Sequence, residues 1–241
     1  MRLLLLLLLA LPAAASGQIN SALLVDPNPD LRNPAKDAPL VLAAKGTAFS
    51  ATLLLAAGDK PHPTALLLND LRSIVQNEDL AQTLRRAGWN VLYARYRTAP
   101  TPATALEDAE AQVTLLLDPA NLTGYHIDAK KIVPIGFDAG AQLALALTVA
   151  HPQFPAAIAL SLPAVPAETT KLAAHPVLLF STEEANSQQL AEGVFTAIKT
   201  ASPHSLHLHL HTDHTYATRR IAMQSAIVDW LARLTELHTD K

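Results

Sequence analysis

The sequence contains no cysteine among its 241 residues. This absence excludes disulfide bonds, thiolate metal ligands and a lipid-modified cysteine. A chain without thiols also suits an oxidising compartment such as a periplasm, where a stray thiol is a liability. Stability must therefore come from a hydrophobic core.

Charged residues are also scarce, at 16% of the chain, and the formal net charge is only -3. Such a balance gives no general attraction to nucleic acid or to an anionic membrane. We therefore expect that the protein binds neither nucleic acid nor a membrane. We expect a small-molecule substrate or ligand as its partner. Hydrophobic residues make up 50% of the chain, which suffices for one sizeable core and is too much for a disordered protein.

The first 17 residues have the order of a secretory signal peptide. Arg2 supplies one positive charge, an apolar run covers residues 3–11, and small residues follow. Because this run is too short for a permanent membrane anchor, we expect cleavage near residues 15–17. The prediction is a secreted or periplasmic protein without membrane association after cleavage, with an uncleaved anchor as the alternative.

The remaining chain divides into a leader and a domain. Residues 18–37 are rich in Pro, Asp and Asn without apolar periodicity, which predicts an extended N-terminal leader. Residues 38–241 are predicted to form a single α/β domain. It opens with apolar runs over residues 40–43 and 51–57 that are joined through Gly46, as in an antiparallel pair of strands.

Strand-like and helix-like segments then alternate. Residues 64–70 form a continuous apolar run of strand length, and residues 77–88 form a helix pattern with an Asn cap and a closing glycine. Such alternation requires parallel crossovers. The predicted fold class is α/β, a doubly wound, mostly parallel sheet of about eight strands with helices on both faces and no large cap. Further strands are expected over residues 90–96, 130–136, 156–162, 175–181 and 205–211, and further helices over residues 102–117, 187–200 and 217–237.

One stretch of sequence carries the strongest functional signal. Residues 132–152, IVPIGFDAGAQLALALTVAHP, read as a buried strand, a tight turn and a helix of small residues. Gly136 and Gly140 frame the turn, and Asp138 stands where a Gly-x-Ser-x-Gly turn presents its nucleophile. The alternative is that Asp138 is only a turn residue, because aspartate tolerates tight turns.

Four segments in order resemble the α/β-hydrolase superfamily, from about residue 40 to residue 237. KPHPTALLLND is similar to the strand before the oxyanion loop, and LRRAGWNVLYARYRTAP to the next helix and strand. YRTAPTPATALEDAEAQV is similar to a segment of hormone-sensitive-lipase-like esterases, and IDAKKIVPIGFDAGAQLAL to the nucleophile turn. The resemblance, to esterase/lipase-like branches that include dienelactone-hydrolase-like proteins, implies a hydrolase of the carboxylesterase type without a cofactor.

The same resemblance assigns catalytic roles by position. Asp138 takes the place of the nucleophilic serine. The acid should follow the strand PVLLFS, where STEEA points to Glu184, with Glu183 as the alternative. The base should be His214 in HTDHTYA, so that the order nucleophile, acid, histidine is kept along the chain. Two adjacent acids in a polar loop are otherwise read as solvated surface.

The resemblance also indicates the oxyanion side of the site. Ala139 follows Asp138, and Asn69 and Asp70 replace the His-Gly run of the family. The carboxylate of Asp70 beside Asp138 would oppose a developing negative charge. These departures predict weakened or lost esterase chemistry.

An aspartate at the nucleophile position suits other electrophiles better than esters. Its attack on an ester gives a mixed anhydride, whereas attack on a saturated carbon gives an ester, as in the dehalogenase and epoxide-hydrolase branches that the turn also resembles. Those branches resemble proteins with a helical cap after the sixth strand, whose tyrosines or tryptophan grip the epoxide oxygen or the halide. Residues 161–176, at the corresponding place here, contain no aromatic residue. Two alternatives stay open: a non-catalytic pseudo-hydrolase that serves binding or protein contact, and an Asp-nucleophile hydrolase acting on a carbon–halogen or epoxide-like electrophile.

The stretch HSLHLHLH places His207, His209 and His211 on one face of a strand. Such spacing is compatible with a metal site. No acid or cysteine of metal-site spacing accompanies the histidines, so we expect a polar, solvent-facing side of a strand and no metal.

Overall fold

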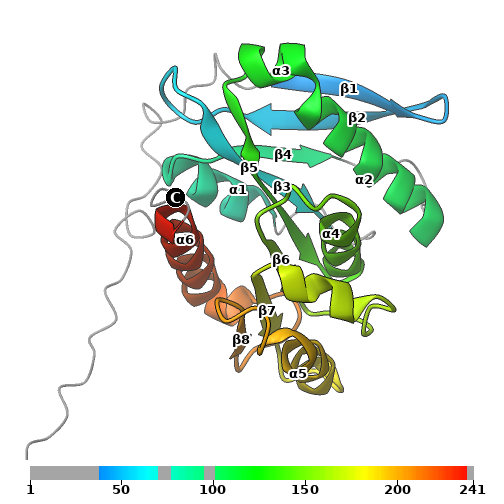
Figure 1. The fold of residues 1–241 in the computed structure, drawn as a ribbon, viewed down its shortest axis with the longest axis vertical. Helices are drawn as coiled ribbons and strands as arrows, with labels where there is room; N and C mark the ends of the chain where they lie inside the picture. Colours follow the sequence, from blue (N-terminus) through cyan, green and yellow to red (C-terminus); the bar gives the residue numbers. More distant parts are fainter. Residues whose placement is uncertain (1–37, 70–76, 95–100, 238–241) are drawn as a thin grey trace, which may run out of the picture.

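A computed structural model describes residues 38–69, 77–94 and 101–237 of the chain (Figure 1). The predicted signal peptide, the predicted leader up to residue 37, and Asp70 lie outside the described residues. Figure 1 follows the described chain from the blue strand β1 to the red helix α6.

The described strands form one eight-stranded sheet in the order β1-β2-β4-β3-β5-β6-β7-β8. The pairs β1–β2 and β2–β4 are antiparallel, and all pairs from β4 to β8 are parallel. This confirms the predicted mostly parallel sheet and its antiparallel opening pair. The strands are β1 (Ala38–Ala44), β2 (Thr47–Leu54), β3 (His62–Leu68), β4 (Asn90–Ala94), β5 (Ile127–Phe137), β6 (Ala157–Leu160), β7 (Val177–Ser181) and β8 (Leu206–His209).

Helices cover both faces of the sheet (Figure 1). Residues of α1 and α6 share a buried cluster on one face, and residues of α2, α4 and α5 form two clusters on the other. The doubly wound architecture is therefore confirmed. The helices are α1 (Asn77–Arg86), α2 (Pro102–Leu117), α3 (Pro119–Gly124), α4 (Ala139–Ala150), α5 (Ser187–Ile198) and α6 (Arg220–Leu237), with 3-10 turns η4 (Thr169–Ala174) and η5 (Ala217–Arg219).

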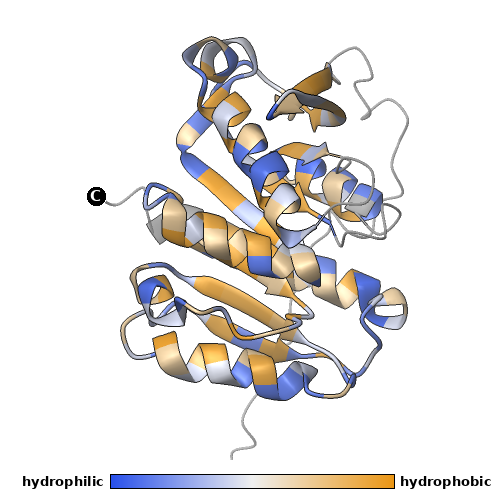
Figure 2. Ribbon diagram, turned by 90° about the vertical axis from the view of Figure 1, so that its right-hand side faces the viewer, coloured by the Kyte–Doolittle hydropathy of each residue, from blue (hydrophilic) through white to orange (hydrophobic). Residues whose placement is uncertain are grey.

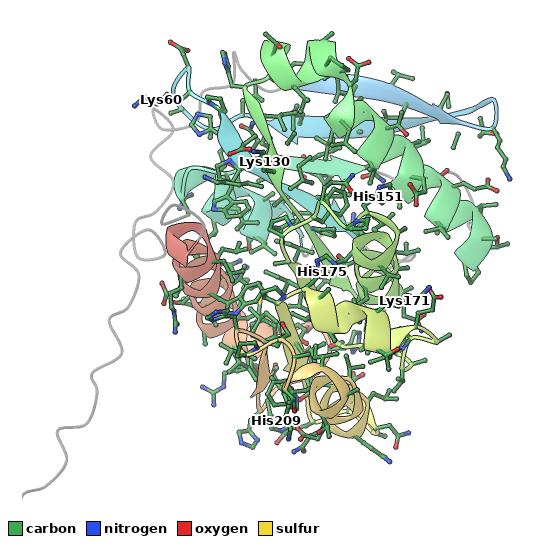
Figure 3. The ribbon with its side chains drawn as sticks, viewed as in Figure 1. Lys60, Lys130, His151, Lys171, His175 and His209 are labelled. Atoms are coloured by element: carbon green, nitrogen blue, oxygen red, sulfur yellow. The ribbon has the colours of Figure 1, made fainter. Side chains whose placement is uncertain are left out.

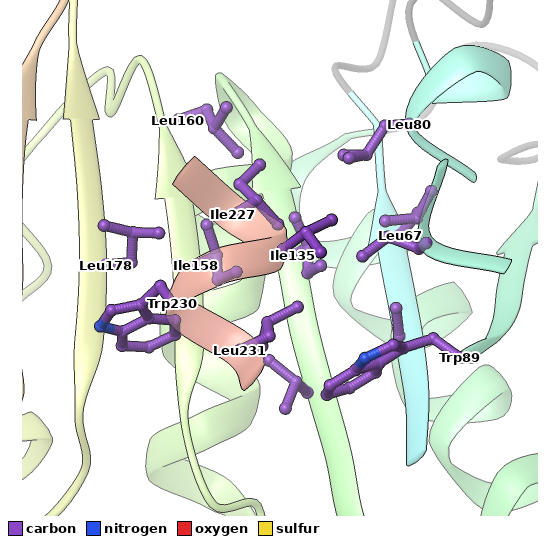
Figure 4. Close-up of a cluster of buried hydrophobic side chains, with 14 of the residues drawn as sticks. Leu67, Leu80, Trp89, Ile135, Ile158, Leu160, Leu178, Ile227, Trp230 and Leu231 are labelled. Carbon is purple, nitrogen blue, oxygen red and sulfur yellow. The ribbon is translucent and has the colours of Figure 1, made fainter. Parts of the chain in front are cut away.

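The core is built from apolar side chains of the central strands and of the helices packed on them. In Figure 4, Leu67, Ile135 and Ile158 of three neighbouring strands face Ile227 and Leu231 of α6. In Figure 2 the central strands are mostly hydrophobic, whereas the helices packed on them carry both hydrophobic and hydrophilic residues. Because both faces of the central strands are covered, these strands read as continuous apolar runs rather than alternating ones.

The ends of the parallel strands position the candidate site. Strand β5 runs for 11 residues and ends at Phe137, directly before Asp138. The next two strands of the sheet, β6 and β7, run parallel to β5 and end at the same edge, at Leu160 and Ser181. In open α/β sheets, ligands bind at the carboxyl ends of the strands. No helix of the described ranges is both long and apolar enough to cross a membrane.

Candidate active site

Asp138 occupies a sharp turn between β5 and α4. Its backbone has φ 48° and ψ -115°, a conformation that is rare for a residue other than glycine. Its N–H donates to the carbonyl oxygen of Leu160 at 2.9 Å, and its own carbonyl oxygen accepts from the N–H of Ala141 at 2.9 Å. Both backbone groups are thus held by neighbours, which keep Asp138 in a strained conformation.

The two glycines of the turn allow close contact between backbones. A Cβ atom on Gly136 would lie 1.9 Å from the carbonyl oxygen of Gly140. A Cβ atom on Gly140 would lie 2.0 Å from the carbonyl oxygen of Leu68, the last residue of β3. Any other residue at either position would push β5, α4 and β3 apart.

Asp138 does not perform the usual structural task of an aspartate at a helix start. It is the N-cap residue of α4, yet its side chain makes no capping hydrogen bond. An aspartate at an N-cap normally accepts such a bond from the second or third helical N–H. The adjoining amides, beginning with Ala139, lack acceptors within the helix and leave partial positive charge near the carboxylate. The side chain of Asp138 therefore does not cap α4.

His214 and Glu184 form a hydrogen-bonded pair. One oxygen of Glu184, Oε1, accepts from the backbone N–H of His214 at 3.2 Å and is also bonded to the ring Nδ1. Because a carboxylate only accepts, Nδ1 carries the hydrogen, and in a neutral ring Nε2 keeps its lone pair. The side chains are 49% and 47% exposed. In the neutral form the ring can therefore accept a proton only at Nε2, and the side chain is about half exposed.

The negative charge of Asp138 also acts on His214 of this pair. The hydrogen bond that the ring of His214 donates to Glu184 raises the pKa of His214 above its ordinary value. Partial burial acts in the opposite direction, and the negative charges of Glu184, Asp138 and Asp213 add to the rise. Asp138 therefore lies close enough to His214 for its charge to act on the ring. Asp138 and Glu184 follow the ends of β5 and β7, and His214 lies in the loop after β8.

Glu183 has a different partner. Its carboxylate is bonded to Nδ1 of His211 at 2.9 Å, and its N–H donates to the carbonyl oxygen of Thr212 at 3.1 Å. The two neighbouring acids thus serve two different histidines. This geometry favours Glu184 over Glu183 as the partner of His214.

Comparison with known proteins bears on the fold. No protein-family model matches the sequence, and no curated protein does so. Among solved structures, a fungal esterase from Rhizomucor miehei superimposes with a TM-score of 0.69 at 15% identity, over 84% of each chain. An esterase from Pyrococcus furiosus gives 0.67 at 15%, over 82% of this chain and 91% of its own. A hyperthermophilic esterase from Pyrobaculum calidifontis gives 0.68 at 13%, over 83% of each chain.

The protein has the α/β-hydrolase fold. This confirms the fold that the sequence resemblance implies. Identities of 15% and below establish the fold alone, so the chemistry has to be argued from the side chains.

The α/β-hydrolase fold has no large insertion between β6 and β7 here. Residues 161–176 contain only the short turn η4, and its Leu172 is buried in the cluster formed with α4 and α5. Between β6 and β7, the described residues therefore agree with the prediction of no large cap.

Asn69, which is predicted to lie on the oxyanion side, follows β3 and lies directly beside the turn. Asn69 is only 3% exposed, and a Cβ atom on Gly140 would lie 2.7 Å from its carbonyl oxygen. Its side-chain Oδ1 has no hydrogen-bond partner among the residues that the structure describes. The other predicted residue here, Asp70, is outside the described residues.

Tyr216 is a residue of the site that sequence analysis missed. It follows His214 by two residues and has a φ of 55°. Its buried ring meets Phe137 and Phe180 edge-on, with centroids 6.4 and 6.3 Å apart, and its hydroxyl shares a 2.9 Å hydrogen bond with Ser161. Burial raises the pKa of the phenol. Tyr216 thus anchors the histidine loop beneath the turn, but a single aromatic residue in a sequence gives no sign of this.

The expectation that the strand histidines face solvent is wrong for His207. Its side chain is only 8% exposed, since α5 packs over it. Its Nε2 is bonded to Ser181 Oγ at 2.8 Å and its Nδ1 to Glu192 at 3.0 Å, and the His207 bond lowers the pKa of Glu192. His209, labelled in Figure 3, contacts the same Ser181 oxygen at 3.0 Å. Within the described ranges, no group of three or more potential ligands is placed to hold a metal ion.

A titration of His214 can test whether Glu184 raises its pKa. We expect the ring to titrate above the ordinary value of 6.5 and the Glu184→Gln variant to lower its pKa, because the largest cause of the rise is removed. Since the folded pKa is raised, the pair stabilises the fold most at pH values below the unfolded pKa, and this contribution is lost as the pH rises through the folded pKa. NMR titration of the ring protons measures the pKa. Glu183→Gln is the matched control, and an equal drop in both variants would contradict the assignment.

Proposed function

We propose that the protein is an exported hydrolase of the carboxylesterase type that uses Asp138, His214 and Glu184 as catalytic residues. One observation carries the proposal: the strained Asp138 does not cap its own helix, while its charge acts on a histidine that Glu184 orients. The esterases that share the fold support the hydrolase class. The predicted signal peptide over residues 1–17 supports export to a periplasm or the exterior.

Asp138 cannot form the acyl-enzyme intermediate of a serine esterase efficiently. Attack of its carboxylate on an ester would form a mixed anhydride, and the carboxylate would be expelled from the tetrahedral intermediate more readily than an alkoxide. Water is therefore the nucleophile in our proposal. Asp138 accepts a hydrogen bond from this water and, with Glu184, stabilises the positive charge that develops on His214.

The reaction follows from the orientation of the histidine. Neutral His214 takes a proton from water through Nε2 as the water oxygen adds to the acyl carbon. The imidazolium then gives this proton to the departing alkoxide, so that acid and alcohol are released and the ring is neutral again. The N–H of Ala139 is the oxyanion donor that follows from its position after Asp138. Because Asp138 repels the oxyanion, we expect slow turnover of small esters.

A second candidate is an aspartate-nucleophile hydrolase acting on a carbon–halogen or epoxide-like electrophile. The side chain of Asp138, which makes no capping bond, favours this candidate. The carboxylate would displace halide or open the epoxide to form an aspartyl ester, and water activated by His214 would hydrolyse that ester. The segment over residues 161–176 speaks against it, because it has no aromatic residue to grip a halide or an epoxide oxygen.

A three-protein assay tests the proposal. Wild type, Asp138→Ser and Asp138→Ala are compared on short-acyl p-nitrophenyl esters. We expect slow turnover by wild type, faster turnover by Asp138→Ser, whose hydroxyl would complete a serine site, and a loss of about tenfold or more in Asp138→Ala.

Two other outcomes would contradict the esterase proposal. Activity in the serine variant alone would mean that His214 and the oxyanion donors are competent and that the native substrate is a different electrophile. Halide release from haloalkanes by wild type would then identify the second candidate. If none of the three proteins hydrolysed the esters, the result would favour the non-catalytic pseudo-hydrolase.

A further inference from the structure

A cavity lies at the edge of the sheet opposite to Asp138. It is formed where β4, β5 and β6 begin, and the second half of α6 closes one side. Val133 in its wall precedes Asp138 by five residues of an extended strand, so the two lie about 16 Å apart. The cavity is therefore separate from the candidate active site.

The interior of this cavity is apolar. Its walls are the side chains of Trp89, Val133, Pro155, Leu231 and Leu234, and Trp89 and Leu231 lie next to each other in Figure 4. Its volume is about 170 Å³, close to the roughly 150 Å³ of an apolar cavity that binds benzene. The space fits one aromatic ring or a short hydrocarbon chain.

The rim of the cavity carries an excess of positive charge. Asp128, Lys130 and Lys131 line it. Asp128 accepts a bond from the backbone N–H of Lys130 at 3.0 Å and pairs with the Lys131 ammonium at 3.6 Å. Within the described ranges, no carboxylate forms an ion pair with the exposed Lys130 ammonium. One cation at the mouth is thus available to a ligand.

We infer that this cavity binds a small carboxylate with an apolar body, such as an aromatic or short-chain aliphatic acid. The hydrocarbon part fills the space beside Trp89 and Leu231, where burial of apolar surface drives binding. The carboxylate stays at the rim beside Lys130, where it keeps contact with water and avoids the penalty for burying a charge. An apolar pocket with a few polar groups converging on it is the usual form of a ligand site.

Calorimetric titration with benzoate and hexanoate at low ionic strength tests the inference. For ligands of this size we expect a Kd on the order of 1 mM. Benzyl alcohol, which has the same ring without the charge, should bind about threefold more weakly or worse, because the ion pair with Lys130 is partly exposed. Binding should also raise the melting temperature in proportion to ligand saturation.

Variants separate the two parts of the site. Lys130→Gln, at an exposed position, should weaken benzoate binding about threefold and leave benzyl alcohol binding unchanged. Lys171→Gln, a lysine of η4 away from the cavity in Figure 3, should change neither affinity. Leu234→Phe should fill the space and abolish binding of both ligands.

Three results would overturn the inference. The first is the absence of benzoate and hexanoate binding at 20-fold above the expected Kd, that is about 20 mM. The second is equal affinity for benzoate and benzyl alcohol. The third is unaltered benzoate affinity in a folded Leu234→Phe variant, which would locate binding elsewhere.

Discussion

Replacing His214 with alanine is expected to lower kcat/KM for ester hydrolysis by about 10²- to 10⁴-fold, the range for loss of a general base. In the proposed mechanism, no other group takes the proton from water. Nδ1 of His214 is bonded to Glu184, so only Nε2 is available for the transfer. The loss should therefore appear in kcat, whereas KM changes little because the ring is not proposed to hold the acyl group.

The adjacent pair of Glu183 and His211 provides a matched control for Glu184 and His214. His211 and Glu183 lie in the same two loops and make the same type of ring-to-carboxylate bond, at 2.9 Å. Glu184→Gln should reduce kcat and move the acidic limb of the pH–rate profile to lower pH, because the pKa of His214 falls. His211→Ala and Glu183→Gln should leave both unchanged. Equal losses in the two pairs would mean that loop structure, rather than catalysis by His214, accounts for the effect.

Gly140→Ala is expected to destabilise the protein by about 4 kcal/mol or more, which lies at the upper end for single substitutions. The added methyl would lie 2.0 Å from the carbonyl oxygen of Leu68, and 2.7 Å from that of Asn69. Both contacts are to backbone, which cannot rotate away as a side chain can. Relief requires that α4 move away from β3 in the middle of a packed core. Urea unfolding followed by circular dichroism measures the loss.

A second helical glycine gives the matched comparison. Gly193 lies inside α5, and a Cβ atom there would only touch Val165 at 3.8 Å, an ordinary packing distance. Gly193→Ala should therefore stabilise the protein by up to about 1 kcal/mol, because alanine favours helix. If Gly140→Ala unfolded at the urea concentration of wild type, the close approach of α4 to β3 would be wrong.

Much of the fold could be predicted from the sequence because its signals are local. Caps, glycines and apolar runs mark each strand and long helix, and the structure places α2 over residues 102–117, as the sequence predicts. The helix α3 and the turn η4 were not predicted. Both are six residues long, which is too short for a helical period to be recognised.

The candidate site was predictable only in part, because side-chain partners depend on tertiary packing. Position along the chain pointed to His214, but two adjacent acids cannot be distinguished by spacing, and the choice of Glu184 required its contact with the ring. The burial of His207 depends on α5, which covers β8 only after folding. Tyr216 was missed for the same reason, since its role is contact with Phe137 and Phe180.

The backbone of the turn at Asp138 is held by main-chain contacts. Its N–H and carbonyl oxygen are bonded to neighbouring backbone, and the close approaches at Gly136 and Gly140 are to backbone atoms. These backbone contacts do not themselves require a particular side chain at position 138. The contacts that shape the turn and the group that determines its chemistry are therefore carried by different atoms, so a substitution at position 138 can change reactivity while the hydrogen bonds of the turn backbone stay available.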